Sequence, residues 1–192
     1  AGKGDRMMST SKFTMLLAAL LVAASGAALA AGGPEIRMEP APINRLDLAS
    51  QQRGARIFVN YCLNCHTAKY MRYSQLADDL ALTEDELREN LMFTGTRVYD
   101  PMLSSMPGEQ ARLWFGSSPP DLSLIVRSRG RDYVYTFLKS FYEDPSRPTG
   151  ANNAVLPQTS MPDVLAVLQG AQAPRYESAP GADGKPVQHL AG

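Results

Sequence analysis

The sequence lacks the features of several common protein classes. Its 19 basic and 19 acidic residues balance, so charge gives no general reason to expect nucleic-acid binding. It has no Gly-rich phosphate loop, no Ser/His/Asp arrangement for nucleophilic catalysis and no internal repeat. After residue 30, no stretch approaches about 18 consecutive apolar residues, so no transmembrane helix is predicted in that part. The 14 Pro and 15 Gly among 192 residues instead predict one domain of modest helices and many loops.

The first thirty residues have the pattern of a secretory signal peptide. A basic residue precedes an apolar run at 13–24, and small residues follow at Ala28 and Ala30. The run is too short to cross a hydrocarbon core of about 30 Å comfortably, although an uncleaved anchor is the alternative. We expect cleavage after Ala30 and export of the remainder. Residues 1–6, which precede two methionines, are interpreted as upstream or added sequence.

Cysteine is scarce, and both cysteines lie in the segment NYCLNCHTAKYM (60–71), where His66 directly follows Cys65. A Cys62–Cys65 disulfide of the redox-active kind is expected near a βαβ pattern, which this sequence does not show. Zinc requires about four ligands, and the remaining candidate, His189, lies in a polar tail. The arrangement C-x-x-C-H is the signature of covalent haem attachment, in which two thiols bind the porphyrin and the histidine binds iron. The sequence therefore predicts one haem c.

The residues before the motif, 48–62, predict an amphipathic helix that runs into it. Gly54, Phe58 and Cys62 are four residues apart and share one face of that helix. A glycine inside a helix costs about 1 kcal/mol relative to alanine, so it commonly has a packing reason. A second helix that crosses close over Gly54 would be such a reason, and an ordinary surface glycine is the alternative.

The second axial position of the iron is either open, which suits small-molecule chemistry, or closed by a side chain, which suits electron transfer. Methionine opposite histidine raises the reduction potential. Met92 is expected in the core and Met71 is too close to His66 to reach the opposite face. The remaining candidates are Met38, Met102, Met106 and Met161. We favour Met161, because it lies in an extended, Pro-flanked stretch late in the chain; Met106 is the runner-up and His189 another rival.

An acidic helix is predicted after the motif. Thr83 and Glu86 form a capping box, and six acidic residues with a single Arg lie between 78 and 89. This charge is either a docking patch for a basic partner or a solvated helix start. A further short helix is expected at 107–115, with the only Trp.

Two more helices are predicted around Gly130. Asp121 is expected to cap a helix that ends near Arg129, and a second helix is expected over 132–142. Haem carries two propionates, which need cationic partners when buried. The candidates are Arg127, Arg129 and Arg131, and at least two of these are expected to be solvated.

The residues now described resemble the cytochrome c1 family, in its proteobacterial form, from about Gln52 to Gln172. The resemblance is carried by RGARIFVNYCLNCHTAKYMRYSQLADD (53–79), WFGSSPPDLSLIVRSRGRDYVYTFLKSFYEDPSRPTG (114–150) and NNAVLPQTSMPDVLAVLQG (152–170). The PPDLSLI…RG.DY pattern is far more specific than C-x-x-C-H. The resemblance implies a mostly α, cytochrome c-like haem domain with long loops and few or no strands.

The resemblance also implies roles for individual residues. Cys62 and Cys65 match the thioether cysteines, His66 the proximal iron ligand and Met161 the distal ligand. Four further matches lie beside the haem, its propionates or the porphyrin edge: Arg129, Tyr133, Pro119 and Pro120.

The function implied is that of the haem subunit of ubiquinol–cytochrome c oxidoreductase, the bc1 complex. Such a subunit takes single electrons from the Rieske iron–sulfur protein, passes them to a cytochrome c, and assembles with cytochrome b on the periplasmic side of the inner membrane. It transfers electrons and makes no bonds of its own. A free soluble periplasmic c-type carrier, or a haem enzyme or sensor with an open sixth site, are the alternatives.

The expected domain organisation follows from the same resemblance. Residues 1–30 are the signal peptide, 31–170 the cytochrome c-type haem domain, and 171–192 a loop. Members of the family continue into a last core helix and then a membrane-anchor helix. The last core helix would cross over Gly54, and the anchor helix would bind the membrane. Because the sequence stops before either, we expect it to be truncated at its C-terminus and less stable than the full domain.

Overall fold

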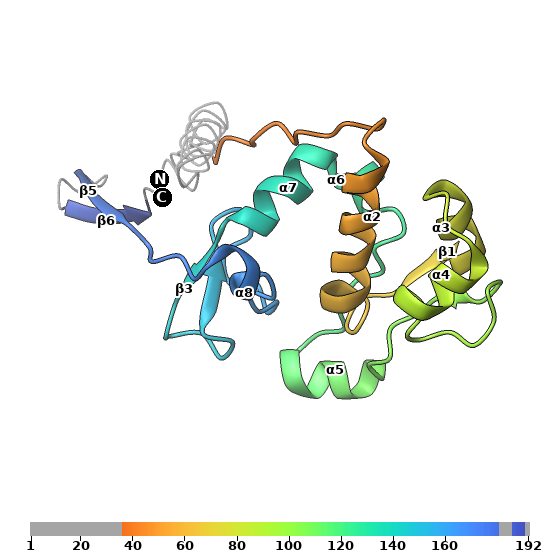
Figure 1. Cartoon of the computed structure of the whole chain (residues 1–192). Coiled ribbons are helices and arrows are strands. Elements are labelled where there is room, and N and C mark those ends of the chain that lie inside the picture. The colour runs from red at the N-terminus through yellow and green to blue at the C-terminus, as the bar shows by residue number, and fades with distance from the viewer. Residues whose placement is uncertain (1–35, 181–185, 191–192) are drawn as a thin grey trace, which may run out of the picture. The chain divides into compact units, whose positions relative to one another are not determined.

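The computed structural model describes residues 36–180 and 186–190, and the predicted signal peptide lies outside these ranges. The described part is mostly helical with short strands, as the sequence predicted (Figure 1). Its helices are α2 Leu48–Ile57, the π-helix η2 Phe58–Cys62, α3 Tyr73–Asp79, α4 Glu84–Asn90, α5 Gly108–Phe115, α6 Ile125–Arg129, α7 Arg131–Lys139 and α8 Ala166–Gln169. Its strands are β1 Ala68–Arg72, β2 Pro101–Met102, β3 Phe141–Glu143, β4 Ala151–Asn153, β5 Tyr176–Pro180 and β6 Pro186–Leu190.

Local sequence signals explain where several helices begin and end. The predicted capping box is present in α4, where the Thr83 side chain accepts from the Glu86 backbone and Glu86 accepts from the Thr83 backbone. Glu84 pairs with Arg88 one turn later, at 2.7 Å. Two of the six acidic residues between 78 and 89, Glu84 and Glu86, therefore form contacts inside α4. The turn after α5 is made by Gly116, whose φ of 73° suits glycine.

The helices around Gly130 differ from the prediction at two boundaries. The helix α6 begins only at Ile125, because the Asp121 carboxylate accepts hydrogen bonds from Ser123 and Lys69 instead of capping a helix. Gly130 separates α6 from α7 as predicted, with a φ of 89°. The helix α7 ends at Lys139 rather than at Tyr142, because Phe141 and Tyr142 pair with β4 as part of β3.

The strands form three antiparallel pairs within the described residues, β1–β2, β3–β4 and β5–β6. In the second pair, Phe141 lies opposite Asn153 and Glu143 opposite Ala151. The third pair lies in the stretch 171–192, where the sequence analysis expected a loop; here Tyr176 lies opposite Leu190. Residues 171–175 are irregular chain before β5.

The main hydrophobic core lies between η2, β1, β2, α3 and α4, of which β1, α3 and α4 lie together in Figure 1. Its buried members are Val59, Leu63, Ala68, Tyr73, Ala77, Leu80, Leu87, Leu91, Val98 and Met102. Met71 and Met92 pack against this cluster from its edge, as expected for methionines that fill irregular gaps. Removal of this apolar surface from water stabilises the segment that carries the two cysteines.

No helix in the described ranges is both long and apolar enough to cross a membrane.

Candidate haem-attachment site

The helix before the motif changes its winding just ahead of the first cysteine. From Phe58 to Cys62 it is a π-helix, and the backbone N–H of Leu63 donates to the carbonyl oxygen of Phe58 at 3.0 Å. Val59 within this turn and Leu63 directly after it are both buried. Single π-turns occur frequently at functional sites. The sequence predicted the helix as far as Cys62, but its apolar spacing could not reveal the wider turn.

The two cysteines lie on one tight turn as free thiols. The backbone N–H groups of Cys65 and His66 both donate to the carbonyl oxygen of Cys62, at 3.1 and 2.8 Å. Burial raises the pKa of the Cys62 thiol, and the neighbouring Cys65 raises it further. Burial also raises the pKa of Cys65. Both side chains are therefore protonated thiols at neutral pH, and they are not paired with each other.

The imidazole of His66 is held by a backbone carbonyl. Its Nδ1 lies 2.8 Å from the carbonyl oxygen of Pro120, and because a carbonyl can only accept, Nδ1 carries the proton. The unprotonated Nε2 then has its lone pair available to bind a metal ion. A metal-binding histidine commonly donates a hydrogen bond from its other ring nitrogen, the one that does not bind the metal. The free thiols and this imidazole together fit a covalently attached haem.

The segment 120–123, which we call the proline clamp, is bonded to the chain just after the motif. Leu122 N–H donates to the Thr67 carbonyl at 2.7 Å, and Tyr70 N–H donates to Ser123 Oγ at 3.1 Å. Asp121 accepts from the backbone of Lys69 at 3.0 Å and from Ser123 at 2.9 Å. These bonds place the Pro120 carbonyl against His66.

The charge of Asp121 supports this arrangement. Burial would raise the pKa of Asp121, but hydrogen bonds from Ser123 and Lys69 outweigh it and lower the pKa overall. The carboxylate is therefore ionised at neutral pH and remains a strong acceptor. The sequence analysis assigned Asp121 to a helix cap. The Asp-x-Ser spacing after two prolines, typical of a side chain that bonds the backbone two residues on, is the signal that could have identified it.

A second loop, at 104–106, also bonds the motif and the residue that follows it. Ser104 Oγ donates to the Asn64 carbonyl at 2.7 Å, and Ser104 N–H donates to Thr67 Oγ1 at 3.1 Å. Met106 N–H donates back to Ser104 Oγ at 3.0 Å. This contact keeps Met106 beside the cysteine turn. Met102, by contrast, is buried in the main core, where its thioether packs against apolar neighbours.

The candidate propionate partners separate into different environments. The Arg129 guanidinium lies over the Tyr133 ring, 5.5 Å from its centroid, which brings together two residues that the resemblance placed beside the haem. Tyr133 stacks on Phe137, with ring centroids 6.3 Å apart. Arg131 instead lies 3.4 Å from the Asp132 carboxylate. Of the two prolines, Pro119 is half-buried, whereas Pro120 is exposed and acts through its carbonyl.

Met161 is half-buried and lies between β4 and α8, in a stretch without regular structure. Its backbone N–H donates to Thr159 Oγ1 at 3.4 Å. In the described residues, no hydrogen bond, ion pair or ring contact joins 159–163 to the cysteine turn. The residues just before this segment, 155–158, are bonded to Asn152 and Asn153, two buried side chains to which the sequence analysis gave no role.

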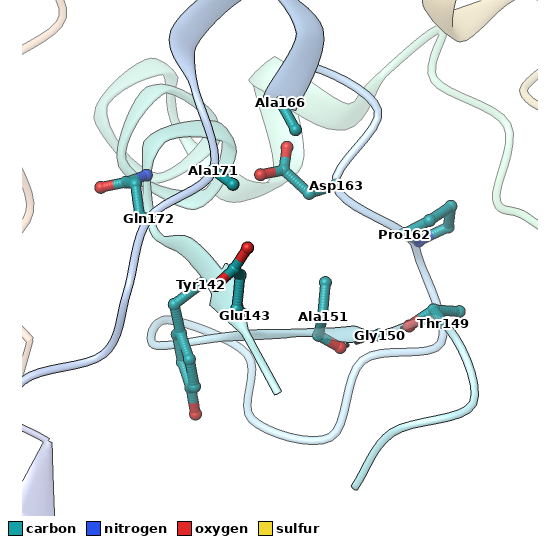
Figure 2. Close-up of a pocket in the computed structure, with 10 residues that line it drawn as sticks. All are labelled: Tyr142, Glu143, Thr149, Gly150, Ala151, Pro162, Asp163, Ala166, Ala171 and Gln172. Atoms are coloured by element: carbon teal, nitrogen blue, oxygen red, sulfur yellow. Dashed lines mark hydrogen bonds between the residues drawn. The ribbon is translucent and has the colours of Figure 1, made fainter. Parts of the chain in front are cut away.

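A cavity of about 220 Å³ lies next to the Met161 segment. Figure 2 shows that the carboxylates of Glu143 and Asp163 point toward its interior, with the methyl groups of Ala151 and Ala166 on opposite walls. Pro162 forms part of the rim. The residues directly after Met161 therefore lie across an open space rather than against a packed surface.

Comparison with known proteins shows several relatives. A family model described as the cytochrome c1 family matches residues 39–100. Cytochrome c1 of Allochromatium vinosum is 46% identical over 173 residues, which are 90% of this chain and 70% of that protein. A protein of Nitrosomonas europaea named ammonia monooxygenase gamma subunit is 46% identical over 140 residues, 73% of this chain and 59% of its own length. Cytochrome c1 of Rhodospirillum rubrum is 29% identical over 168 residues, 74% and 61% respectively.

Proposed function

The chain belongs to the cytochrome c1 family, and we propose that it is the haem-bearing electron-transfer subunit of a quinol–cytochrome c reductase. In this role it takes single electrons from a Rieske iron–sulfur protein and passes them to a cytochrome c. The partners within the complex are cytochrome b and the Rieske protein, and the haem domain lies on the periplasmic side of the inner membrane. The 46% identity to a bacterial cytochrome c1 over nine-tenths of the chain supports this proposal.

The observation that carries the proposal is the geometry at the motif. Two free thiols lie on one turn with His66 directly after them, and the His66 Nδ1 proton is bonded to the Pro120 carbonyl at 2.8 Å. Cys62 and Cys65 would bind haem c covalently, and His66 Nε2 would bind its iron. A bound haem supplies a one-electron couple. The protein determines its potential through the axial ligands and the surrounding dielectric.

Residues outside the motif complete the proposed site. Met161 would also bind the haem iron, and Arg129, held over Tyr133, would balance propionate charge. Pro119 and Pro120 would border the porphyrin, with Pro120 also orienting the imidazole through its carbonyl. Since no bond of a substrate is made or broken, the work of these residues is to hold two ligands, exclude water and neutralise charge.

The decisive experiment is Met161→Ala in the haem-loaded protein. We expect the parent protein to bind carbon monoxide poorly when reduced, whereas the variant binds it readily and has a lower reduction potential, because it has lost the thioether ligand. Met106→Ala is the matched control, since Met106 is also followed by proline and lies beside the cysteine turn. If Met161→Ala keeps the parent spectrum and potential, the ligand assignment is wrong. If the matured protein fails to stain for haem peroxidase activity after denaturing electrophoresis, the haem proposal itself fails.

The relative from Nitrosomonas europaea favours a second candidate. The same haem site could serve a complex of the monooxygenase type that this relative's name indicates. The two candidates differ in their partners rather than in their chemistry. Purification of the tagged chain from membranes separates them, because recovery of cytochrome b and the Rieske protein supports the reductase and recovery of monooxygenase subunits supports the alternative.

A further inference from the structure

Asn153 organises the chain that leads to Met161. Its side chain is fully buried, and its Oδ1 accepts from the backbone N–H groups of Val155 and Leu156 at 2.9 and 3.0 Å. Its Nδ2 donates to the Phe137 carbonyl at the end of α7, at 2.7 Å. One buried amide therefore joins α7 to both backbone groups that begin the irregular segment after β4.

Asn152 holds the next part of the same segment. Its Oδ1 accepts from the Gln158 N–H at 2.8 Å, and its Nδ2 donates to Asp144 Oδ2 at 2.9 Å. Arg147 Nη2 donates to the Gln158 carbonyl at 2.8 Å. Gln158 is thus bonded at both its backbone N–H and its carbonyl, by side chains from two different parts of the chain.

Gln158 has the backbone conformation that needs such support. Its φ is 64°, a left-handed region that costs an ordinary residue roughly 1–2 kcal/mol. Such a conformation persists only where the surroundings over-determine it, and it commonly marks a functional constraint. Met161 follows three residues later, linked through the bond from Thr159 N–H to the Leu156 carbonyl and its own bond to Thr159 Oγ1.

The chain on the other side of Met161 is held less closely. Pro162, Asp163 and Ala166 border the cavity of about 220 Å³ (Figure 2). The next hydrogen bonds to another segment run from the side chains of Gln169 and Gln172 to the carbonyls of Leu138 and Lys139. Gln158, three residues upstream of Met161, is therefore bonded to other segments closer to Met161 along the chain than any residue downstream is.

We propose that Asn152 and Asn153 are positioning residues for Met161: they fix the 154–158 segment so that the Met161 thioether is presented to the haem iron. This inference rests on the proposed function, which makes Met161 the distal ligand. Neither asparagine touches the reacting atoms, so both act through the backbone of Gln158, Val155 and Leu156.

The test is Asn152→Ala and Asn153→Ala in the haem-loaded protein, with carbon monoxide binding by the reduced form as the main readout. Loss of one amide should raise the ratio of carbon monoxide-bound to unbound protein, at a fixed gas concentration, about tenfold; this corresponds to about 1.4 kcal/mol, close to one hydrogen bond. The methionine–iron charge-transfer band of the oxidised protein should weaken in parallel. Asn90→Ala is the matched control, because Asn90 also bonds a backbone carbonyl but in α4.

Milder variants keep the test decisive if an alanine variant does not fold. Asp144→Asn removes the charge that accepts from Asn152, and Arg147→Lys removes the guanidinium group that donates to the Gln158 carbonyl; both side chains lie outside the apolar core. Each should raise carbon monoxide binding by a smaller factor. A purely structural role would lower the unfolding midpoint while leaving the gas binding and the charge-transfer band unchanged, and that result in the folded variants overturns the proposal.

Met161→Ala in the same series distinguishes a failure of the positioning role from a failure of the ligand assignment. If it opens the iron to carbon monoxide and the asparagine variants do not, the positioning role is wrong and the proposed function stands. If Met161→Ala changes nothing, the ligand assignment fails and the positioning role fails with it.

Discussion

Two regions of the molecule hold the two proposed iron ligands by different forces. The motif region, residues 55–106, contains the whole main core, and its buried side chains are apolar. The methionine region, residues 136–172, buries few side chains in the described structure, and most of those are polar. They are Thr136, Phe141, Ala151, Asn152 and Asn153.

This difference in burial shows that the two ligands are kept in place by different interactions. Apolar packing is non-directional, so the motif region uses it for stability and takes direction from the proline clamp and Ser104. The methionine region buries little apolar surface, and buried amides supply both stability and direction there. Such fully bonded polar networks specify one arrangement, but an unpaired member is costly.

The largest effect is expected from Leu63→Ala in the motif region. Leu63 lies between the two cysteines and is 0% exposed, so truncation should lower the free energy of unfolding by about 3 kcal/mol, through lost burial and the cavity left behind. Denaturant unfolding of the haem-loaded protein measures it. Leu113→Ala, at a residue 79% exposed on α5, should change stability by less than about 0.5 kcal/mol. Equal effects at the two positions would contradict the assignment of the core.

The motif region was largely predictable from the sequence. Helical spacing, the Thr83–Glu86 capping box and C-x-x-C-H are local patterns whose physical causes lie within a few residues. There are two exceptions. Apolar spacing does not reveal the π-turn at Phe58–Cys62. The Asp-x-Ser spacing at Asp121 is a local signal, but its partner Lys69 lies far along the chain.

Less of the methionine region was predictable from the sequence. The sequence indicates Gly130 as the break before α7 and Met161 as a ligand candidate. It also predicts that α7 continues to Tyr142, because Phe141 fits the apolar stripe of the helix. The pairing of β3 with β4, some ten residues on, decided that boundary instead. Asn152 and Asn153 have no hydrophobic periodicity, so their burial could not be inferred from a pattern of apolar residues.

Asn153→Leu tests whether buried amides, rather than apolar packing, hold the methionine region. Leucine nearly conserves volume and adds apolar surface, which would be neutral if packing alone held this region. We expect instead a loss of about 2 kcal/mol, because three partly buried backbone groups lose their partners and leaving such a group unpaired costs about 1–3 kcal/mol when it is shielded from water. Unfolding in urea measures the loss. Asn60→Leu, at an exposed amide bonded to the Arg56 carbonyl, should be close to neutral.

Acid should weaken both regions through carboxylates whose pKa is lowered by folding. Backbone N–H donors from Arg97 and Thr96 lower the pKa of Asp100, in the motif region, from 3.8 to about 2. Hydrogen bonds from Ser146 and Asn152 lower the pKa of Asp144, in the methionine region. A depressed folded-state pKa contributes stability that is present above the unfolded value, near 3.8, and is lost as the pH falls through the folded value.

If the unfolding midpoint is measured from neutral pH down to pH about 2, it should therefore decrease once the pH is below about 4. Asp100→Asn and Asp144→Asn should each flatten this fall, Asp100→Asn more strongly and to lower pH. Because both side chains are accessible to solvent, we expect each effect to be smaller than those of the buried variants. A variant that follows the parent curve would show that its carboxylate does not contribute.

The smallest effect should come from Gly54→Ala in α2, and its sign is informative. A Cβ at Gly54 would meet no atom within 4 Å, so alanine should stabilise the protein by about 0.5–1 kcal/mol through helix propensity alone. Gly95→Ala in the same region should destabilise it, because its Cβ would lie 2.7 Å from Cε2 of the buried Tyr73 ring. Thermal unfolding of both variants gives the two signs. A loss of stability at Gly54 would instead show that a neighbour packs closely on this face of α2, which is the reason the sequence analysis gave for a glycine at that position.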